Sequence, residues 1–475
     1  MTKDRLIIRK RIGDIETPVG AMLKIGPDQA GSFLFESILG GERLGRYSFI
    51  GHKPHKWFRV TNGVAQTALN ADFDDAATLD ASPVDALKTF VASAEATAEE
   101  DLPPMASGAF GYVGYDMIQY VEPVEITAPR ELDVPDALLV IPHIVIIFDH
   151  LHQEIILVGR VFDGDVDQTN TLLDDIDLKL SQPAPLVPSD KDGTPLNFTS
   201  NTSKEQYFDM VGRARDYTRA GDIFQVVPSQ RLQAPFSSKS ISFYRALRRL
   251  NPSAFMFHMS FGDLRLVGSS PEILVRVRDK RVAIRPIAGT RPRSGDPIED
   301  TRRAESLLND EKEMAEHLML LDLGRNDVGR VAAYGSVEVT ESFTIERYSH
   351  VMHIVSHVEG NLRDGLDSVD ALLAGFPAGT VSGAPKIRAM QIIDELEQSR
   401  RGIYGGAIGY FGWQGDLDTC IALRTAVIKD KTLYIQAGGG VVLDSDPQYE
   451  FDETLHKAGA LMKAAELSSS YEFDQ

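Results

Sequence analysis

Strand-like and helix-like patterns follow one another irregularly along this chain, and this irregularity is the strongest constraint on its fold. Short runs of branched or alternating apolar residues dominate before residue 180, whereas strand and helix patterns mix after residue 200. A doubly wound parallel sheet requires regular alternation of strand and helix. The sequence therefore predicts a mixed α+β architecture.

Residues 181–200 are rich in proline, serine and aspartate and lack periodicity, which predicts a linker. We thus expect an N-terminal lobe at residues 1–180 and a second lobe at residues 201–468. Periodicity predicts strands at 5–8, 57–60, 138–148, 154–161, 263–267, 281–287, 404–413, 420–428 and 433–437. It predicts helices at 83–98, at 301–323, from Ser382 as N-cap to about 396, and after Asp446 as N-cap.

The composition limits the kinds of molecule that the protein is expected to bind and the setting in which it is expected to act. The 475 residues carry a formal net charge of -20, which argues against nucleic acid but not against a small anion in a locally basic site. The longest apolar stretch, 138–148, is too short to span a bilayer, and the N-terminus shows no secretory signal. Cys420 is the single cysteine, so no intrachain disulfide can form and a cytoplasmic setting is expected.

The octapeptide 286–293, PIAGTRPR, combines a glycine, a hydroxyl and two arginines on a proline-stiffened turn. Gly289 lets a ligand approach the backbone, and Thr290 offers a hydroxyl. Arg291 and Arg293 can bind carboxylates through paired hydrogen bonds, so the turn suits a small polyanion. An ordinary strand-to-turn corner is the alternative.

Two expected helices each present carboxylates on one face. Glu313 and Glu316 are three residues apart in one helix, and Glu450, Glu453 and Lys457 share a face of the other. Such helices can hold Mg²⁺, which binds a few carboxylates and keeps positions open for substrate oxygens. Two solvated acidic faces would show the same spacing.

Three further segments could bind an anion. Small residues flank Arg424 in the expected strand 420–428, which suits either a ligand carboxylate or a structural ion pair. The glycines 438–440 would expose backbone N–H groups or form a flexible turn. The loop 378–386 lacks Walker A spacing but leads into a helix N-terminus.

Three histidines lie close together in the sequence. In an extended strand, His353 and His357 would share one face, with His350 opposite. His353 could act as a general acid or base near neutral pH, and a core position is the alternative.

Together these segments resemble the chorismate-utilising enzymes, and in particular the anthranilate synthase large subunits. PIAGTRPR is similar to the family signature, residues 316–327 and 452–457 resemble its two magnesium motifs, and 379–386 resembles its Gly-Thr-x-Ser-Gly-Ala-Pro-Lys element. The resemblance covers nearly the whole chain and is strongest from residue 206 to 463. It implies layered antiparallel β-sheets flanked by helices, with a regulatory N-terminal lobe and a chorismate-binding lobe.

The resemblance also implies roles for single residues. Glu316 and Glu453 are expected to bind Mg²⁺. His353 and Glu272 are the expected acid/base groups, with the division of labour between them open. The residues expected to bind chorismate are Gly289, Thr290, Thr380, Tyr404, Arg424, Gly438, Gly439, Gly440 and Lys457.

Two positions separate members of the family by nucleophile. Aminodeoxychorismate synthases usually carry a lysine where this chain has Ala288, and an alanine cannot form a covalent amino intermediate. Isochorismate and salicylate synthases activate water with a lysine where this chain has Gln225. Both positions predict direct addition of ammonia to chorismate, giving anthranilate and pyruvate, the first committed step of tryptophan biosynthesis. An aminodeoxychorismate synthase of folate biosynthesis and a catalytically silent amino-acid-binding relative are the alternatives.

The same resemblance implies a partner and an inhibitor. The chain has no Gly-x-Cys-x-Gly element, so a separate glutamine amidotransferase subunit is expected to supply the ammonia. Residues 34–37 resemble half of the tryptophan site of feedback-inhibited members. The other half is usually Asn-Pro-Ser-Pro-Tyr-Met, and here Ala254 and Phe255 replace proline and tyrosine. Ser37, Ala254, Phe255 and Met256 are the expected tryptophan contacts, with core packing as the alternative.

Overall fold

Nearly all strands of the computed structural model, which describes residues 4–39, 43–185, 193–348 and 351–471, join one sheet that divides into two arms. The arms meet at two long antiparallel strands, β5 (Tyr47–Thr61) and β10 (Ala137–Asp149). Their register shifts between Ile141 and Pro142, because proline cannot donate to the ladder. The antiparallel partners β11 (Glu154–Val161) and β1 (Asp4–Ile12) extend the sheet beyond β10.

Each arm combines strands from both sides of residues 181–200. The first arm continues from β5 through β2 (Phe33–Glu36), β15 (Phe255–Phe261), β16 (Leu264–Ser270), β25 (Thr425–Lys429), β26 (Thr432–Gly438) and β14 (Ser229–Pro235). The second continues from β10 through β9 (Gly108–Val113), β23 (Ala407–Gly412), β24 (Leu417–Ile421), β17 (Ile273–Arg278), β18 (Arg281–Ile284) and β21 (Val351–Asn361), which also pairs with β19 (Ile287–Pro292) and β20 (Glu338–Arg347). The division into two lobes stays a prediction.

An apolar core fills the space between the arms. Phe35 of β2 stacks on Phe49 of β5 with ring centroids 5.1 Å apart, and Phe110 and Tyr410 of the other arm lie in the same cluster. Burying these rings supplies much of the hydrophobic stabilisation. This core confirms the layered arrangement of antiparallel sheets.

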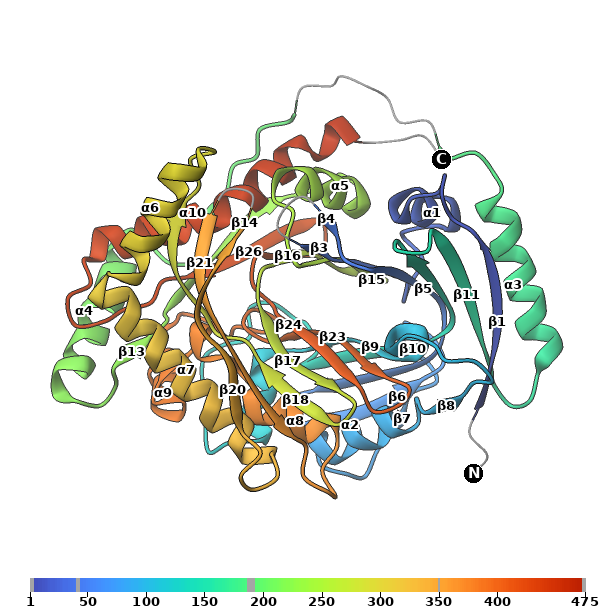
Figure 1. Ribbon diagram of the computed structural model, residues 1–475, viewed down its shortest axis with the longest axis horizontal. Helices are drawn as coiled ribbons and strands as arrows, with labels where there is room; N and C mark the ends of the chain where they lie inside the picture. The colour runs from blue at the N-terminus through green and yellow to red at the C-terminus, as the bar shows by residue number, and fades with distance from the viewer. Residues whose placement is uncertain (1–3, 40–42, 186–192, 349–350, 472–475) are drawn as a thin grey trace.

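Helices cover the outer faces of both arms (Figure 1). The first arm packs against α1 (Pro18–Ile25), α3 (Val166–Leu180), α5 (Ser240–Leu250) and α10 (Pro447–Leu467). The second packs against α2 (Pro83–Ala92), α7 (Glu311–Val331) and α8 (Ser368–Gly375). None of the helices in the described part of the chain is long and apolar enough to span a bilayer.

The helix expected at 301–323 is two helices. It divides into α6 (Pro297–Leu308) and α7, because Asp310 accepts hydrogen bonds from the backbone N–H groups of Lys312 and Glu313 and so caps a new helix. The helix expected from Ser382 begins only at α9 (Lys386–Leu396), since the Ser382 hydroxyl donates to the Ala378 carbonyl instead of capping. The N-cap predicted at Asp446 is confirmed.

The continuous strand expected at 420–428 was also wrong. β24 ends at Ile421 and β25 begins at Thr425, and Arg424 lies between them with φ 46°. A non-glycine residue rarely adopts this left-handed conformation, which is found mainly in turns and functional sites. The strand expected at 404–413 begins at Ala407, so Tyr404 precedes it.

Candidate functional site

The expected metal-binding glutamates, Glu316 and Glu453, lie on α7 and α10. Burial raises the pKa of Glu316, and Glu313 and Glu453 add to this through their negative charges. Burial also raises the pKa of Glu450 to about 7, with a further contribution from Glu453. Within the described residues, no three His, Cys, Asp or Glu side chains converge into a ready-made metal site. The carboxylates of α7 and α10 are therefore close enough for one to disfavour the ionised form of another.

Glycines give these carboxylates room. A Cβ at Gly439 would lie 3.0 Å from Glu450 Oε2 and 3.2 Å from Glu453 Oε2, so only glycine leaves both carboxylates undisturbed. A Cβ at Gly440 would lie 2.4 Å from the Gln225 amide nitrogen. The Gly439 N–H already donates to the Pro228 carbonyl, and is therefore not free for an anion as the sequence suggested.

Lys457 and Gln225 border the carboxylates. The Lys457 ammonium group donates to the Gly438 carbonyl at 2.9 Å and lies 3.4 Å from Glu453. The Gln225 amide donates to Glu316 at 3.4 Å. Gln225 belongs to the short strand β13 (Gln225–Val226), which pairs with β22 (Gly383–Ala384) and so connects the carboxylates to the 378–386 loop.

Arg424 carries a positive charge that the protein does not neutralise. Among the described residues, no hydrogen bond or ion pair reaches its guanidinium group, and burial lowers its pKa. Its nearest acidic neighbour by charge is Glu272. A buried, unpaired guanidinium is costly unless an anion binds it, so this residue is the strongest indication of a carboxylate-bearing ligand.

Glu272 and Thr380 form a second polar pair beside Arg424. Burial raises the pKa of Glu272 to about 8, although the Thr380 hydroxyl, which donates at 3.1 Å, and Arg424 both act to lower it. Glu272 therefore keeps its proton at neutral pH. Thr380 lies in the short 3-10 helix η3 (Gly379–Val381).

His353 contacts the octapeptide directly. Its Nδ1 lies 2.8 Å from the Gly289 carbonyl and 3.1 Å from the Thr290 hydroxyl. A carbonyl only accepts, so Nδ1 carries the proton and Nε2 is left as the free atom of the neutral ring. Burial lowers the pKa of His353. His357 instead pairs with Glu359 at 2.8 Å, and His350 lies outside the described residues.

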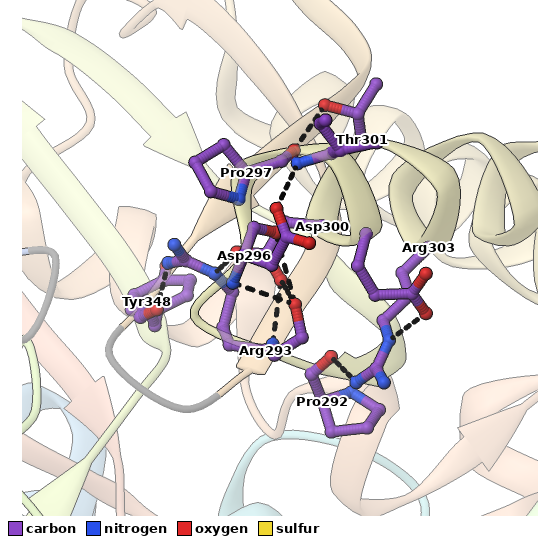
Figure 2. Close-up of polar contacts among 11 residues, drawn as sticks. Pro292, Arg293, Asp296, Pro297, Asp300, Thr301, Arg303 and Tyr348 are labelled. Carbon is purple, nitrogen blue, oxygen red and sulfur yellow. Dashed lines mark hydrogen bonds and ion pairs between the residues drawn. The ribbon is translucent and has the colours of Figure 1, made fainter.

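The two arginines of the octapeptide form ion pairs within the protein, so their guanidinium groups are not available to a ligand. Arg291 pairs with Asp310 at 2.7 Å and with Glu313 at 3.0 Å. Arg293 pairs with Asp300 and donates to the Tyr348 carbonyl at 2.7 Å (Figure 2). The sequence left both a polyanion site and a strand-to-turn corner open for these arginines, and the structure favours the corner, because Asp300 of α6, the helix-capping Asp310 and Glu313 of α7 already satisfy them.

Sequence reasoning missed a buried pair, Arg401 and Glu397, which connects several walls of the site. Arg401 donates to the carbonyls of Val381 and Val227 at 2.6 and 2.5 Å and to Glu397 at 2.6 Å. Its guanidinium group lies 5.4 Å from the ring centre of Tyr404. The pair thus fixes the backbone beside Thr380, the segment after Gln225, and Tyr404. The only sequence signal was an i, i+4 Glu-Arg spacing, which is common on exposed helices.

Tyr404 itself lies between this pair and the glycines. Burial raises the pKa of its hydroxyl to about 12, and the group makes a hydrogen bond with the backbone of Gly438. It is therefore a neutral hydrogen-bonding group at neutral pH.

The expected regulatory residues line a different space. A cavity of about 1070 Å³ is bordered by Ser37, Ala254 and Phe255, whereas the catalytic candidates described above lie outside its lining. Met256 does not border this cavity, and its role in binding tryptophan stays a prediction. Its side chain is fully buried and packs in the core beneath the first arm, because successive residues of β15 point to opposite faces.

Comparison with known proteins shows the family of the chain. The family model for chorismate binding enzymes matches residues 46–463, and the chain therefore belongs to that family. It is similar to anthranilate synthase component 1 of Cereibacter sphaeroides, with 48% identity over 98% of this chain and 95% of the relative. The component 1 protein of Pseudomonas putida is 46% identical over 96% and 94%. The crystal structure of anthranilate synthase component I from Streptococcus pneumoniae TIGR4 superposes with a TM-score of 0.80, at 36% identity over 95% of this chain and 99% of that one. These relatives confirm the resemblance drawn from the motifs.

Proposed function

We propose that this protein is the aminating component of an anthranilate synthase, which converts chorismate and ammonia to anthranilate and pyruvate. The observation that carries the proposal is Gln225. Its neutral amide lies 3.4 Å from Glu316, where it can donate a hydrogen bond but cannot take a proton from water. Ala288, buried in β19, likewise offers no amino group. Ammonia is thus the nucleophile that needs no activating base from the protein.

The described contacts support a proposed task for each remaining residue. Arg424 binds a substrate carboxylate and so neutralises its own buried charge, and the neutral Tyr404 hydroxyl can donate a hydrogen bond to the substrate. Glu272 is protonated at neutral pH and gives that proton to the C4 hydroxyl, which leaves as water while ammonia adds at C2. His353 then removes the C2 proton through Nε2, and the electron pair forms the C2–C3 double bond as the C3–O bond breaks. The enolpyruvate that leaves takes up a proton at its methylene carbon and becomes pyruvate.

Glu316 and Glu453 are the residues that would hold Mg²⁺. Their fit rests on charge, since burial and then the neighbouring carboxylates raise the pKa of Glu316, and Lys457 is the one cation paired with Glu453 among the described residues. Two carboxylates suffice for Mg²⁺, which keeps water or substrate oxygens in its other positions. When bound, the ion supplies positive charge for the ring carboxylate of chorismate.

We further propose a glutamine amidotransferase subunit as the ammonia source, since the only cysteine, Cys420, is buried in β24 and cannot serve as a glutaminase nucleophile. A cytoplasmic setting fits this single reduced thiol. Tryptophan is the proposed inhibitor, bound in the 1070 Å³ cavity beside Ser37, Ala254 and Phe255. Initial rates with and without tryptophan test this part.

The reaction itself is tested with the purified chain, chorismate, magnesium chloride and an ammonium salt, by the blue fluorescence of anthranilate. We expect turnover with ammonium and none with glutamine alone. Glutamine-dependent turnover by the single chain would contradict the separate subunit, and no turnover with either would indicate a silent relative.

A further inference from the structure

The C-terminal end of β20 and the residue after it, Tyr348, lie between the large cavity and His353. Arg285, Glu346 and Tyr348 line the cavity, which Ser37 and Phe255 also border. Glu346 is the direct cross-strand partner of His353 in the β20–β21 ladder. Side chains of directly opposed residues lie on the same face of a sheet. One layer of side chains therefore separates the cavity from His353.

A continuous chain of side-chain contacts connects Arg285, at the cavity, with His353. Arg285 forms an ion pair with Glu346, and the Tyr348 hydroxyl donates to Glu346 at 2.8 Å. The Tyr348 ring meets the His353 ring edge to face, with centroids 5.6 Å apart and an interplanar angle of 65°. A change at the cavity surface of Glu346 or Tyr348 must therefore change what surrounds the imidazole.

The backbone of Tyr348 is hydrogen-bonded to the octapeptide. Arg293 donates to the Tyr348 carbonyl at 2.7 Å, and Asp300 holds the Arg293 guanidinium group (Figure 2). Two octapeptide residues, Gly289 and Thr290, contact His353 Nδ1. Tyr348 is thus connected to the catalytic turn both through its backbone and through the histidine ring.

The charged and polar groups that act on His353 come from several elements. Glu346 of β20 favours the charged imidazolium, as does the Gly289 carbonyl of β19, whereas burial and Arg424 from the β24–β25 turn favour the neutral ring. Glu346 remains ionised, because Arg285 and Tyr348 outweigh burial and lower its pKa. Glu346 is therefore a fixed negative charge that acts on the histidine.

We propose that Glu346 and Tyr348 are positioning residues of His353, and that an amino acid bound in the cavity inhibits catalysis by displacing their side chains. The second half of this inference rests on the proposed function of the cavity. The first half needs only the contacts within the protein.

Glu346→Gln tests the positioning role, with Glu338→Gln, an exposed position on the same strand, as its control. Loss of the negative charge should lower the pKa of His353, because Glu346 favours the charged imidazolium. The acidic limb of the ammonia-dependent kcat/KM profile, corrected for free NH₃, should move to lower pH. The His353 resonance in nitrogen-15 histidine-labelled protein, identified by its loss in His353→Asn, should move in parallel. A lower rate with an unmoved limb and resonance would overturn the proposal, since a merely structural role predicts that result.

Tyr348→Phe tests the coupling, with the exposed Tyr334→Phe as control. We expect tryptophan to bind both variants in calorimetry with nearly the wild-type Kd, but to inhibit Tyr348→Phe about five-fold or more weakly, the low end of usual coupling strengths. Equal inhibition of both variants would overturn the coupling. If tryptophan does not bind the wild-type protein, the proposed inhibitor and the coupling both fail, while the Glu346→Gln result still decides the positioning role.

Discussion

The Glu397→Gln substitution should show how much the buried Arg401–Glu397 pair, which connects several segments of the site, contributes to the stability of the protein. Glu397 is the only carboxylate with which Arg401 forms an ion pair among the described residues, and their side chains are 4% and 1% exposed. The same carboxylate accepts from the Ser229 backbone N–H at 2.8 Å and from its hydroxyl at 2.7 Å. Glutamine keeps the volume and one acceptor oxygen, so the main change is an uncompensated guanidinium charge.

Breaking a buried ion pair in this way costs about 3–5 kcal/mol of unfolding free energy, and we expect the lower end because an acceptor remains. Urea unfolding followed by tryptophan fluorescence and by circular dichroism measures the loss. Glu395→Gln is the matched control, two residues earlier, where the carboxylate pairs with Arg213 and both side chains are 42% exposed. That exposed pair should contribute about 0–1 kcal/mol. Equal losses in the two variants would refute the reasoning.

Two further predictions concern the site itself. Burial raises the pKa of Glu272 above its unfolded value, so its contribution to stability is fully present below pH 4.5 and is lost as the pH rises through about 8. Glu272→Gln should therefore become more stable than the wild type by up to about 4 kcal/mol at pH 9, while losing activity; an advantage that does not grow with pH would exclude the buried acid. Gly439→Ala should raise the magnesium concentration needed for half-maximal activity, because its Cβ displaces Glu450 and Glu453. Gly459→Ala on α10 meets no atom within 4 Å and should leave that concentration unchanged.

The sequence was sufficient for the architecture and for the residue types of the site. Antiparallel layers, the helices that carry Glu316 and Glu453, and the Asp446 cap follow from periodicity, motif resemblance and local hydrogen-bonding chemistry. The helices and the cap depend on residues near one another in the chain, whereas the antiparallel layers pair distant strands and were expected only from the family resemblance.

What the sequence could not supply depends on distant partners. Arg291 and Arg293 look free in the octapeptide, and only the packing of α6 and the Asp310 cap shows that they are already paired. Arg424 looks like a strand residue, and only the turn geometry reveals its strained and unpaired state. The Arg401–Glu397 pair and the layer of side chains at Tyr348 likewise arise from long-range contacts that periodicity does not encode.

The identity of the product tests the central claim most directly. The purified chain is incubated with chorismate, magnesium chloride and nitrogen-15 ammonium, and the products are separated and examined by mass spectrometry. The neutral amide of Gln225 and the small side chain of Ala288 predict nitrogen-15 anthranilate and pyruvate in equal amounts. A stable labelled aminodeoxychorismate, or an unlabelled isochorismate formed with water, would contradict it.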